Sequence, residues 1–446
     1  MEQYQRQNSD PKAYETAFSH LGKTGRSGSY CGARAREKCR RGKQLVNYAN
    51  IQAKASILKG LETLEWAIGL PSSSHFTGRF LEVGTGVTCR DERVPVGIVA
   101  SIVPFNFPIM VPFWTIPIAL ATGNCIILKP SEKVPLSLSF LAPLFKQAGF
   151  PDGAFQLVHG GKDVVEAICA HPDIQAVSFV GSSAVAEIVA TQCHRVGKRV
   201  VALGGAKNHL VAASDCDVEV TAQDIVNSFT GCAGERCMAA SVLLTIGENQ
   251  TLVDRIVELA SQIHPGSASG EMGPVIDAAA LKRIETYIQQ AESTGAKVLL
   301  DGRLWEGRQR NVGFWIGPTI ILHSNPTDQA LHDEIFGPLL SIYSCNSPEE
   351  AIQIEKRSPY GNAAAIYTRS GLIAEWFTKR FSVGMVGVNI GIPVPREPFS
   401  FGGIGRSRFG MQLDITGEGG VDLFTYRRKV TTRWTESADS FFSSKL

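Results

Sequence analysis

Short apolar runs alternate with helical patterns in the first half of the chain, and this alternation constrains the fold most strongly. Runs at 96–103, 125–128, 155–158 and 176–180 have the length and composition of buried strands. The segments between them carry apolar residues at the spacing of an amphipathic helix. Strands that alternate with helices predict a doubly wound parallel sheet, and the fold class is therefore α/β.

Ligands bind at the carboxyl ends of the strands in such a sheet, so the residues that follow the strands are candidate binding residues. Ser182 lies where a strand turns into a helix, and a helix N-terminus can bind a pyrophosphate. The alternative is that Ser182 only caps its own helix, and without a GxGxxG motif the residues favour neither interpretation. The candidates at the strand ends are Asn106, Lys129, Ser131, Glu132, Gly181 and Ser182.

The charge balance argues against nucleic acid and membrane as partners. Lys and Arg number 44 and Asp and Glu 42, which leaves a net charge of +2 over 446 residues and therefore no bulk field. A basic cluster at 34–43 lacks interleaved aromatic residues and is interpreted as a solvated surface. The longest apolar region, 98–128, is interrupted by four prolines, which is not typical of a membrane span.

The cysteines bear on the compartment. There are ten of them without CxxC spacing, so we expect reduced thiols, no metal site and an intracellular protein. The compartment would be the mitochondrial matrix in a eukaryote and otherwise the cytoplasm. The first thirty residues are polar and predict no secretory signal, and the length favours two or three domains.

Cys237 is the candidate nucleophile of the chain. It lies in a run of small residues at 231–240, directly after Arg236. A free thiol has a pKa of about 8.5, so nearby positive charge or oriented amides are needed to raise its thiolate fraction, and Arg236 supplies a charge. Most free cysteines are instead buried small hydrophobic residues, and this segment alone supports the two interpretations equally.

Six motifs in their order along the chain resemble the aldehyde dehydrogenase superfamily, and the resemblance covers most of the chain. Three segments, 206–209, 235–239 and 387–389, resemble its methylmalonate-semialdehyde (malonate-semialdehyde) dehydrogenase branch, which forms an acyl-CoA. The six motifs lie at 104–108, 129–132, 179–182, 204–205, 234–237 and 334–338.

The resemblance implies an NAD-binding domain, an α/β catalytic domain and a β oligomerisation arm that forms a homodimer or homotetramer. Residues 1–48 do not match the family pattern well and form an atypical N-terminal segment. The implied parts are 49–78 with 96–206 for NAD binding, 207–416 for catalysis, and 79–95 with 417–446 for the arm.

The resemblance also implies a role for each site residue. Cys237 attacks the carbonyl carbon of a small aldehyde, and the Asn106 amide and the Cys237 backbone N–H hold the oxyanion. Arg236, and Lys59 in place of a second family arginine, hold a substrate carboxylate. The acidic side chain of Glu132 would repel the 2′-phosphate of NADP and therefore favours NAD. The residues that bind NAD are Phe105, Lys129, Glu132, Ser182, Glu334 and Phe336.

Ala202 distinguishes the possible reactions. Hydrolytic members of the superfamily place a glutamate before the Leu-Gly-Gly turn to activate water, and this chain has alanine there. Without that base the thioester should persist until coenzyme A, an intrinsically good nucleophile, accepts the acyl group. We therefore predict NAD-dependent oxidation of methylmalonate or malonate semialdehyde through a Cys237 thioester, with decarboxylation and formation of propionyl-CoA or acetyl-CoA. A hydrolytic dehydrogenase with another base and a non-catalytic homologue with a defective N-terminus are the alternatives.

Overall fold

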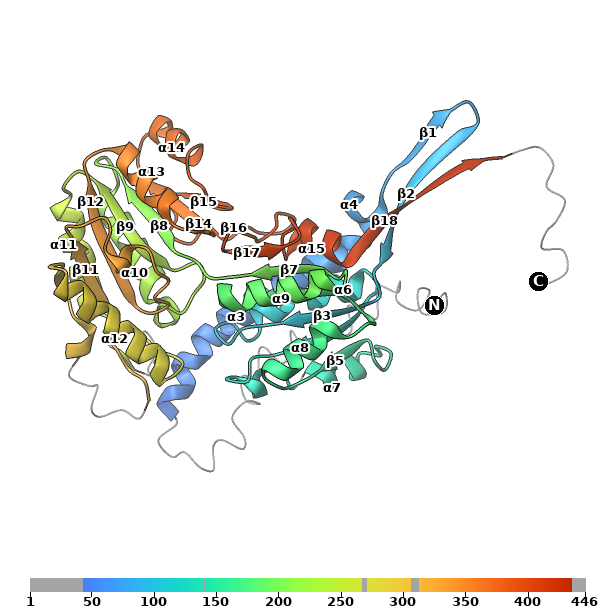
Figure 1. Ribbon diagram of the computed structural model, residues 1–446, viewed down its shortest axis with the longest axis horizontal. Helices are drawn as coiled ribbons and strands as arrows, with labels where there is room; N and C mark the ends of the chain where they lie inside the picture. Colours follow the sequence, from blue (N-terminus) through green and yellow to red (C-terminus); the bar gives the residue numbers. More distant parts are fainter. Residues whose placement is uncertain (1–42, 140, 267–270, 306–312, 435–446) are drawn as a thin grey trace.

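The computed structural model describes residues 43–139, 141–266, 271–305 and 313–434 (Figure 1). Most of the atypical N-terminal segment expected from the sequence, residues 1–42, therefore lies outside the described residues. Two open sheets stand side by side, and a narrow arm of strands projects from one of them. Within the described ranges, no helix is both long and apolar enough to cross a membrane.

The first sheet, called here the coenzyme sheet, confirms the doubly wound arrangement. Its strand order is β17-β7-β6-β3-β4-β5, and every neighbouring pair is parallel except β17 with β7. The strands are β3 (Ile98–Ile102), β4 (Cys125–Lys129), β5 (Phe155–Leu157), β6 (Ile174–Val180), β7 (Arg199–Leu203) and β17 (Arg408–Gly410).

Helices cover both faces of the coenzyme sheet, because alternate residues of its strands are apolar on both sides. Along β7, Val200 and Ala202 pack under one helical layer, whereas Val201 and Leu203 pack under the other. The first layer is α8 (Lys162–Ala170) and α9 (Ser183–Arg195); the second includes α3 (Lys43–Gly69), α6 (Ile116–Ala121), α7 (Leu141–Gln147) and α15 (Gly417–Phe424).

The prediction of one helix over 113–120 is wrong in its bounds. The structure has two short helices there, α5 (Met110–Phe113) and α6, separated by Trp114 and Thr115. Pro117 lies in the first turn of α6, where a missing N–H costs nothing. The prolines of this segment therefore divide the apolar run into two helices.

The second sheet, called the catalytic sheet, has the order β10-β11-β12-β9-β8-β14-β15, with only β10 antiparallel to its neighbour. Its strands are β8 (Asn208–Ala212), β9 (Ala240–Ile246), β10 (Lys297–Leu300), β11 (Thr319–His323), β12 (Leu339–Cys345), β14 (Ala363–Tyr367) and β15 (Met385–Val388). Its helices are α10 (Val218–Thr230), α11 (Gln250–Ser261), α12 (Ala278–Ser293), α13 (Pro348–Arg357) and α14 (Gly371–Thr378). The turn 204–207 carries the chain directly from β7 into β8.

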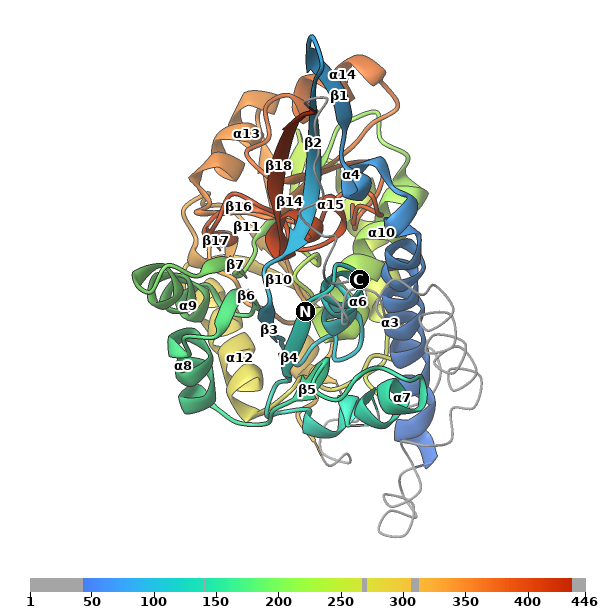
Figure 2. The ribbon, with the colours of Figure 1, turned by 90° about the vertical axis from the view of Figure 1, so that its right-hand side faces the viewer.

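The arm is a three-stranded antiparallel sheet of order β1-β2-β18 (Figure 2). It comprises β1 (Phe80–Gly84), β2 (Val87–Pro95) and β18 (Thr425–Arg433). The sequence predicted an extended tail over 422–434, but residues 422–424 end helix α15, whose Val421, Leu423 and Phe424 are buried in the core beside α6. Short α4 (Ser74–Thr77) precedes the arm, and β13 (Tyr360–Gly361) pairs with β16 (Ile404–Gly405).

Candidate active site

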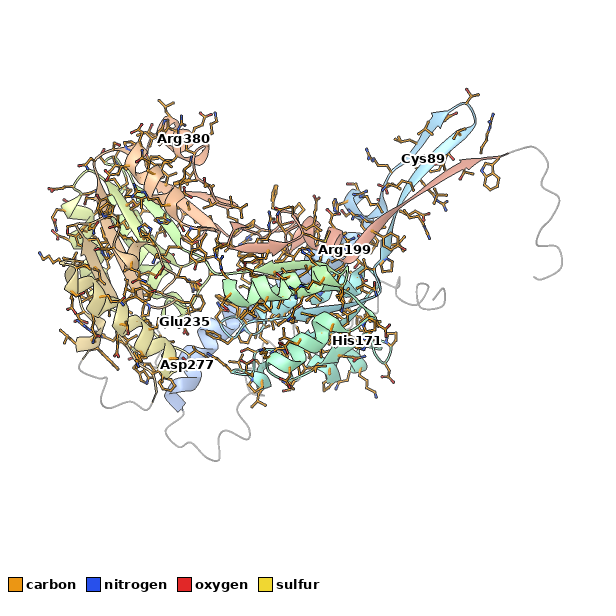
Figure 3. The ribbon with its side chains drawn as sticks, viewed as in Figure 1. Cys89, His171, Arg199, Glu235, Asp277 and Arg380 are labelled. Carbon is orange, nitrogen blue, oxygen red and sulfur yellow. The ribbon has the colours of Figure 1, made fainter. Side chains whose placement is uncertain are left out.

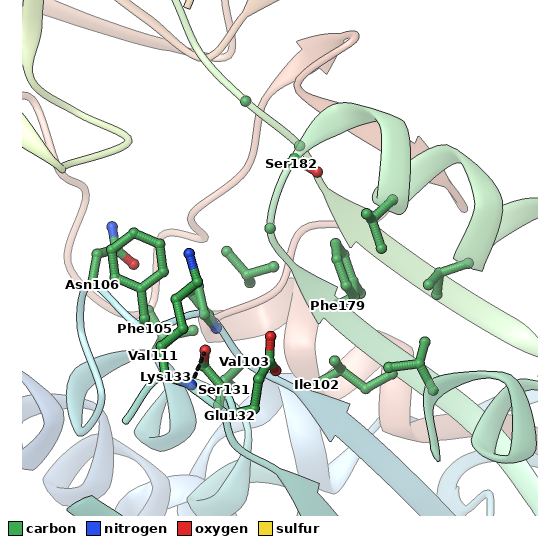
Figure 4. Close-up of a pocket in the computed structure, with 18 of the residues that line it drawn as sticks. Ile102, Val103, Phe105, Asn106, Val111, Ser131, Glu132, Lys133, Phe179 and Ser182 are labelled. Carbon is green, nitrogen blue, oxygen red and sulfur yellow. Dashed lines mark hydrogen bonds between the residues drawn. The ribbon is translucent and has the colours of Figure 1, made fainter. Parts of the chain in front are cut away.

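A cavity of about 690 Å³ lies between the carboxyl ends of the coenzyme-sheet strands and the start of α12. The six candidate residues at the strand ends all line it. Figure 4 shows side chains of β3 and β6, and of the residues that follow β4, around one space. Cys237 and Asn106 line the same cavity, and so do all the residues expected to bind NAD. The latter are Phe105, Lys129, Glu132, Ser182, Glu334 and Phe336.

At one end of the cavity, a buried lysine supports an exposed carboxylate. Lys129 Nζ donates to the backbone oxygens of Pro130 (2.9 Å) and Gly160 (2.8 Å), and it lies 3.3 Å from Glu132 Oε2. The backbone N–H of Glu132 and the charge of Lys129 hold the pKa of the Glu132 carboxyl below its usual value. An ionised carboxylate at this place suits the hydroxyls of a ribose and repels a phosphate.

The N-terminus of α9 opens onto the middle of the cavity. Ser182 is the N-cap residue, but its side chain makes no capping hydrogen bond, so the interpretation of Ser182 as only a self-cap is wrong. Gly181 directly before it packs against the ring of Phe179, because a Cβ at Gly181 would lie 2.6 Å from that ring. A 13-residue helix with an open first turn fits a pyrophosphate.

Glu334 lies beside the turn that joins the two sheets. Its Oε1 accepts the Ala206 N–H at 2.8 Å, and its carboxylate lies so close to Gly205 that a Cβ there would be 2.1 Å from Oε2. Burial raises the pKa of Glu334. Phe336, in a left-handed conformation (φ 55°), packs edge to face on Phe105 at 6.1 Å between ring centroids. Acid, helix terminus and paired aromatic rings therefore fit the ribose, phosphate and base parts of a dinucleotide.

The candidate nucleophile follows a strained turn between α10 and β9. Cys232 and Ala233 have φ values of 53° and 52°, and Gly234 continues the left-handed turn at 69°. Gly234 packs directly on the next loop, because a Cβ there would lie 2.1 Å from the Gly337 oxygen. Non-glycine residues in this conformation are costly and cluster at functional sites, and here the turn delivers Cys237 to the cavity wall.

Asn106 reaches the same wall from the end of β3. Its Nδ2 donates to the backbone oxygen of Glu235 at 2.9 Å, which fixes the amide and leaves one N–H for a substrate oxygen. Glu235 is itself buried, and its Oε1 accepts the Ile276 N–H at 3.2 Å. The two predicted catalytic groups are thus tied together through the residue two positions before Cys237.

The expectation that Arg236 makes Cys237 acidic is wrong in its net effect. Burial raises the pKa of the Cys237 thiol to about 12, and the Glu334 charge adds to the rise. The backbone N–H groups of Cys237 and Met238 lower the pKa of this thiol, as does Arg236, but together they do not outweigh burial. The surroundings of Cys237 therefore favour its neutral thiol over the thiolate.

The two predicted substrate-binding cations, Arg236 and Lys59, are not among the residues that line this cavity. The Arg236 guanidinium packs on Gly231, where a Cβ would lie 2.5 Å from Cζ, and its Nε is 3.5 Å from Cys232 Sγ. Lys59 Nζ is paired with Glu62 Oε2 at 2.8 Å. Their roles toward a substrate carboxylate stay predictions.

The sequence interpretation missed an ion pair between two residues that line the cavity. Lys133 Nζ lies 2.5 Å from Asp277 Oδ2 and 5.2 Å from the centroid of the Phe105 ring. Asp277 also caps α12, and Figure 3 places it with Glu235 on the side of the catalytic sheet that faces the coenzyme sheet. Asp277 before a helical pattern is a recognisable cap signal, but nothing in the sequence pairs it with a lysine 144 positions earlier.

The described residues contain no group of three or more His, Cys, Asp or Glu side chains that could hold a metal ion.

Residues 44–430 match the model of the aldehyde dehydrogenase family. The chain is 42% identical over 388 residues to malonate-semialdehyde dehydrogenase 2 of Geobacillus kaustophilus, covering 86% of this chain and 79% of that protein. It is 39% identical over 392 residues to malonate-semialdehyde dehydrogenase of Pseudomonas aeruginosa, covering 86% and 78%.

Two solved structures are similar over nearly the whole chain. The methylmalonate-semialdehyde dehydrogenase of Oceanimonas doudoroffii has a TM-score of 0.88 at 35% identity, covering 96% of this chain and 88% of that one. The aldehyde dehydrogenase of Bacillus cereus in complex with NAD+ has a TM-score of 0.83 at 25% identity, covering 95% and 83%.

Proposed function

Because the chain belongs to the aldehyde dehydrogenase family, we propose that it oxidises malonate semialdehyde or methylmalonate semialdehyde and transfers the acyl group to coenzyme A. The observation that carries the proposal is the cavity itself. It brings Cys237 and Asn106 to one wall beside Glu334, whereas Ala202 of β7 offers no carboxylate to activate water. Relatives at about 40% identity carry the name malonate-semialdehyde dehydrogenase.

The chain's own groups account for acyl formation. The Cys237 thiol loses its proton to solvent, its sulfur forms a bond to the aldehyde carbon, and the carbonyl electron pair moves onto oxygen. The Asn106 amide and the Cys237 N–H stabilise that oxyanion, and one such donor is worth about 10²–10³ in rate. When bound, NAD would supply the acceptor for the hydride that leaves the same carbon. A thioester on Cys237 remains. The Glu132 carboxylate, which we assign to the ribose of the cofactor, favours NAD over NADP.

The fate of the thioester follows from Ala202. A general base accelerates water attack by about 10²–10⁴, and no such base stands at this position of β7. Coenzyme A supplies a sulfur that needs little assistance. For a β-carboxylated acyl group, loss of CO₂ leaves its electron pair on the α-carbon, which takes up a proton and gives an acetyl or propionyl thioester before transfer. Arg236 and Lys59 are the groups we assign to the substrate carboxylate.

The arm supports assembly as a homodimer or homotetramer. All five residues of β1 are exposed. Among the described residues, both outer strands of the arm have an edge without a paired strand, and another chain can extend such an edge. Six described cysteines are free thiols, which supports an intracellular, reducing compartment for this enzyme. They are Cys89, Cys169, Cys193, Cys216, Cys237 and Cys345.

The test measures NADH formation by the purified protein with malonate or methylmalonate semialdehyde, with and without coenzyme A, and identifies each product by mass. The proposal predicts turnover that depends on coenzyme A and yields acetyl-CoA or propionyl-CoA. Rapid formation of free acid without coenzyme A would support a hydrolytic dehydrogenase instead. Retained NAD binding without any NADH formation would mean a non-catalytic homologue.

A further inference from the structure

Two buried asparagines from neighbouring strands of the catalytic sheet converge on the backbone of the nucleophile. Asn208 begins β8, and Asn362 directly precedes β14, the strand paired with β8. On the other side β8 pairs with β9, with Asn208 opposite Ala240. Because β9 starts three residues after Cys237, this pairing places both amides at the exit of the nucleophile turn. Asn208 is 3% exposed and Asn362 is 7% exposed.

The Cys237 carbonyl oxygen accepts from both amides. Asn208 Nδ2 donates to it at 2.8 Å and Asn362 Nδ2 at 2.9 Å. Asn208 also donates to the Ala239 oxygen at 2.8 Å, while its own Oδ1 accepts the Ala363 N–H at 3.2 Å. Since a backbone N–H can only donate, this last bond fixes which end of the Asn208 amide faces Cys237. Both lone pairs of one carbonyl are therefore held by side chains.

We propose that Asn208 and Asn362 are positioning residues that clamp the peptide between Cys237 and Met238, so that the Met238 N–H faces the Cys237 sulfur. The peptide unit is planar, with its C=O and N–H directed to opposite sides. Anchoring the oxygen on the asparagine side therefore directs the N–H away from it. The clamp acts on the nucleophile assigned in the proposed function and rests on that assignment.

The clamp has a chemical purpose because burial works against ionisation of Cys237. The Met238 N–H is one of the groups that lower the pKa of the thiol, and an N–H donor favours a thiolate over a thiol. Neither asparagine is among the residues that line the coenzyme cavity. The clamp should therefore affect thiolate formation without affecting NAD binding.

The test replaces each clamp residue with leucine, which has a similar shape and cannot donate, and measures alkylation of Cys237 by iodoacetamide at pH 8.5 without aldehyde. Below the thiol pKa the rate follows the thiolate fraction, tenfold for each pKa unit. Trypsin cleaves after Arg236, so Cys237 and Cys232 fall in separate peptides, and Cys232 serves as the internal standard. We expect the Cys237/Cys232 rate ratio to fall about tenfold in Asn362→Leu, because a tenfold change corresponds to the loss of one charge-assisted hydrogen bond. We expect a larger fall in Asn208→Leu.

Asn124 provides a matched control. It directly precedes β4 of the coenzyme sheet, is 1% exposed and donates to the Phe424 backbone oxygen at 3.0 Å. Asn124→Leu should therefore lower stability and leave the rate ratio unchanged. NAD affinity should stay at the wild-type value in Asn362→Leu. An unchanged rate ratio in folded Asn362→Leu would overturn the clamp. This variant decides the test by itself, so the test still holds when Asn208→Leu fails to fold. Because no aldehyde is used, that result is distinguishable from failure of the proposed reaction.

Discussion

Ala202 is fully buried on β7, in the apolar cluster that also contains Phe179 and Val189. Both of those side chains line the cavity, so a longer side chain at position 202 would extend toward the cavity from its apolar floor. The absence of a carboxylate at this residue is the physical basis for assigning the acyl group to coenzyme A rather than to water.

Adding that carboxylate should therefore redirect the product. We expect Ala202→Glu to raise the rate of free-acid formation without coenzyme A by about 10² or more, the usual value of general-base assistance. Product analysis by mass spectrometry measures the ratio of acid to acyl-CoA. Ala202→Gln, similar in size and unable to act as a base, is the control. Equal product ratios in the two variants would contradict the role given to this position.

At the scale of elements, the turn from β7 to β8 holds Glu334 in place. A methyl group at Gly205 would overlap the Glu334 carboxylate at 2.1 Å and displace it from the Ala206 N–H. We expect Gly205→Ala to weaken NAD binding about tenfold, consistent with loss of a buried, charge-assisted contact. Titration of NADH fluorescence measures this affinity.

Gly371 of α14 is the matched control for that substitution, because a Cβ there meets nothing within 4 Å. Gly371→Ala should bind NADH like the wild type. Wild-type affinity in Gly205→Ala would show instead that Glu334 can move without cost, and Glu334 would lose its assigned place at the cofactor.

Elements with clear periodicity were predictable from sequence, whereas contacts between distant residues were not. The strands and helices of the coenzyme sheet follow from local apolar patterns, and the candidate residues at their ends reach one cavity because parallel strands share an edge. The exceptions have local causes that periodicity does not register, such as Pro117 at the start of α6 and the helical residues 422–424. Asn208 and Asn362, 154 positions apart, meet only through strand pairing.

Burial also decided the point on which the sequence argument was wrong. Arg236 is next to Cys237 in the chain, and adjacency suggested an acidic thiol. The folded environment removes water from the sulfur and places Glu334 near it, and both effects favour the neutral thiol. A sequence gives the neighbouring charges but not the desolvation that opposes them.

At the scale of the whole molecule, the arm is the least self-sufficient part of the single chain. Phe80 is 68% exposed and Val83 58% exposed on β1, an apolar surface that a second chain would cover. We expect Phe80→Glu with Val83→Glu to convert the assembly to monomers, measured by sedimentation velocity at micromolar protein. Leu372→Glu on α14, at an apolar residue that is 79% exposed, should leave the assembly intact. Unchanged sedimentation of the double variant would contradict assembly through the arm.

The central claim, an acyl group held on Cys237 until coenzyme A accepts it, is tested most directly by trapping that group. The protein is mixed with NAD and malonate semialdehyde without coenzyme A, quenched in acid and digested with trypsin. We predict that the peptide beginning at Cys237 carries an acetyl thioester, and that adding coenzyme A before the quench releases it as acetyl-CoA. An unmodified Cys237 peptide accompanied by NADH and free acid would contradict the account.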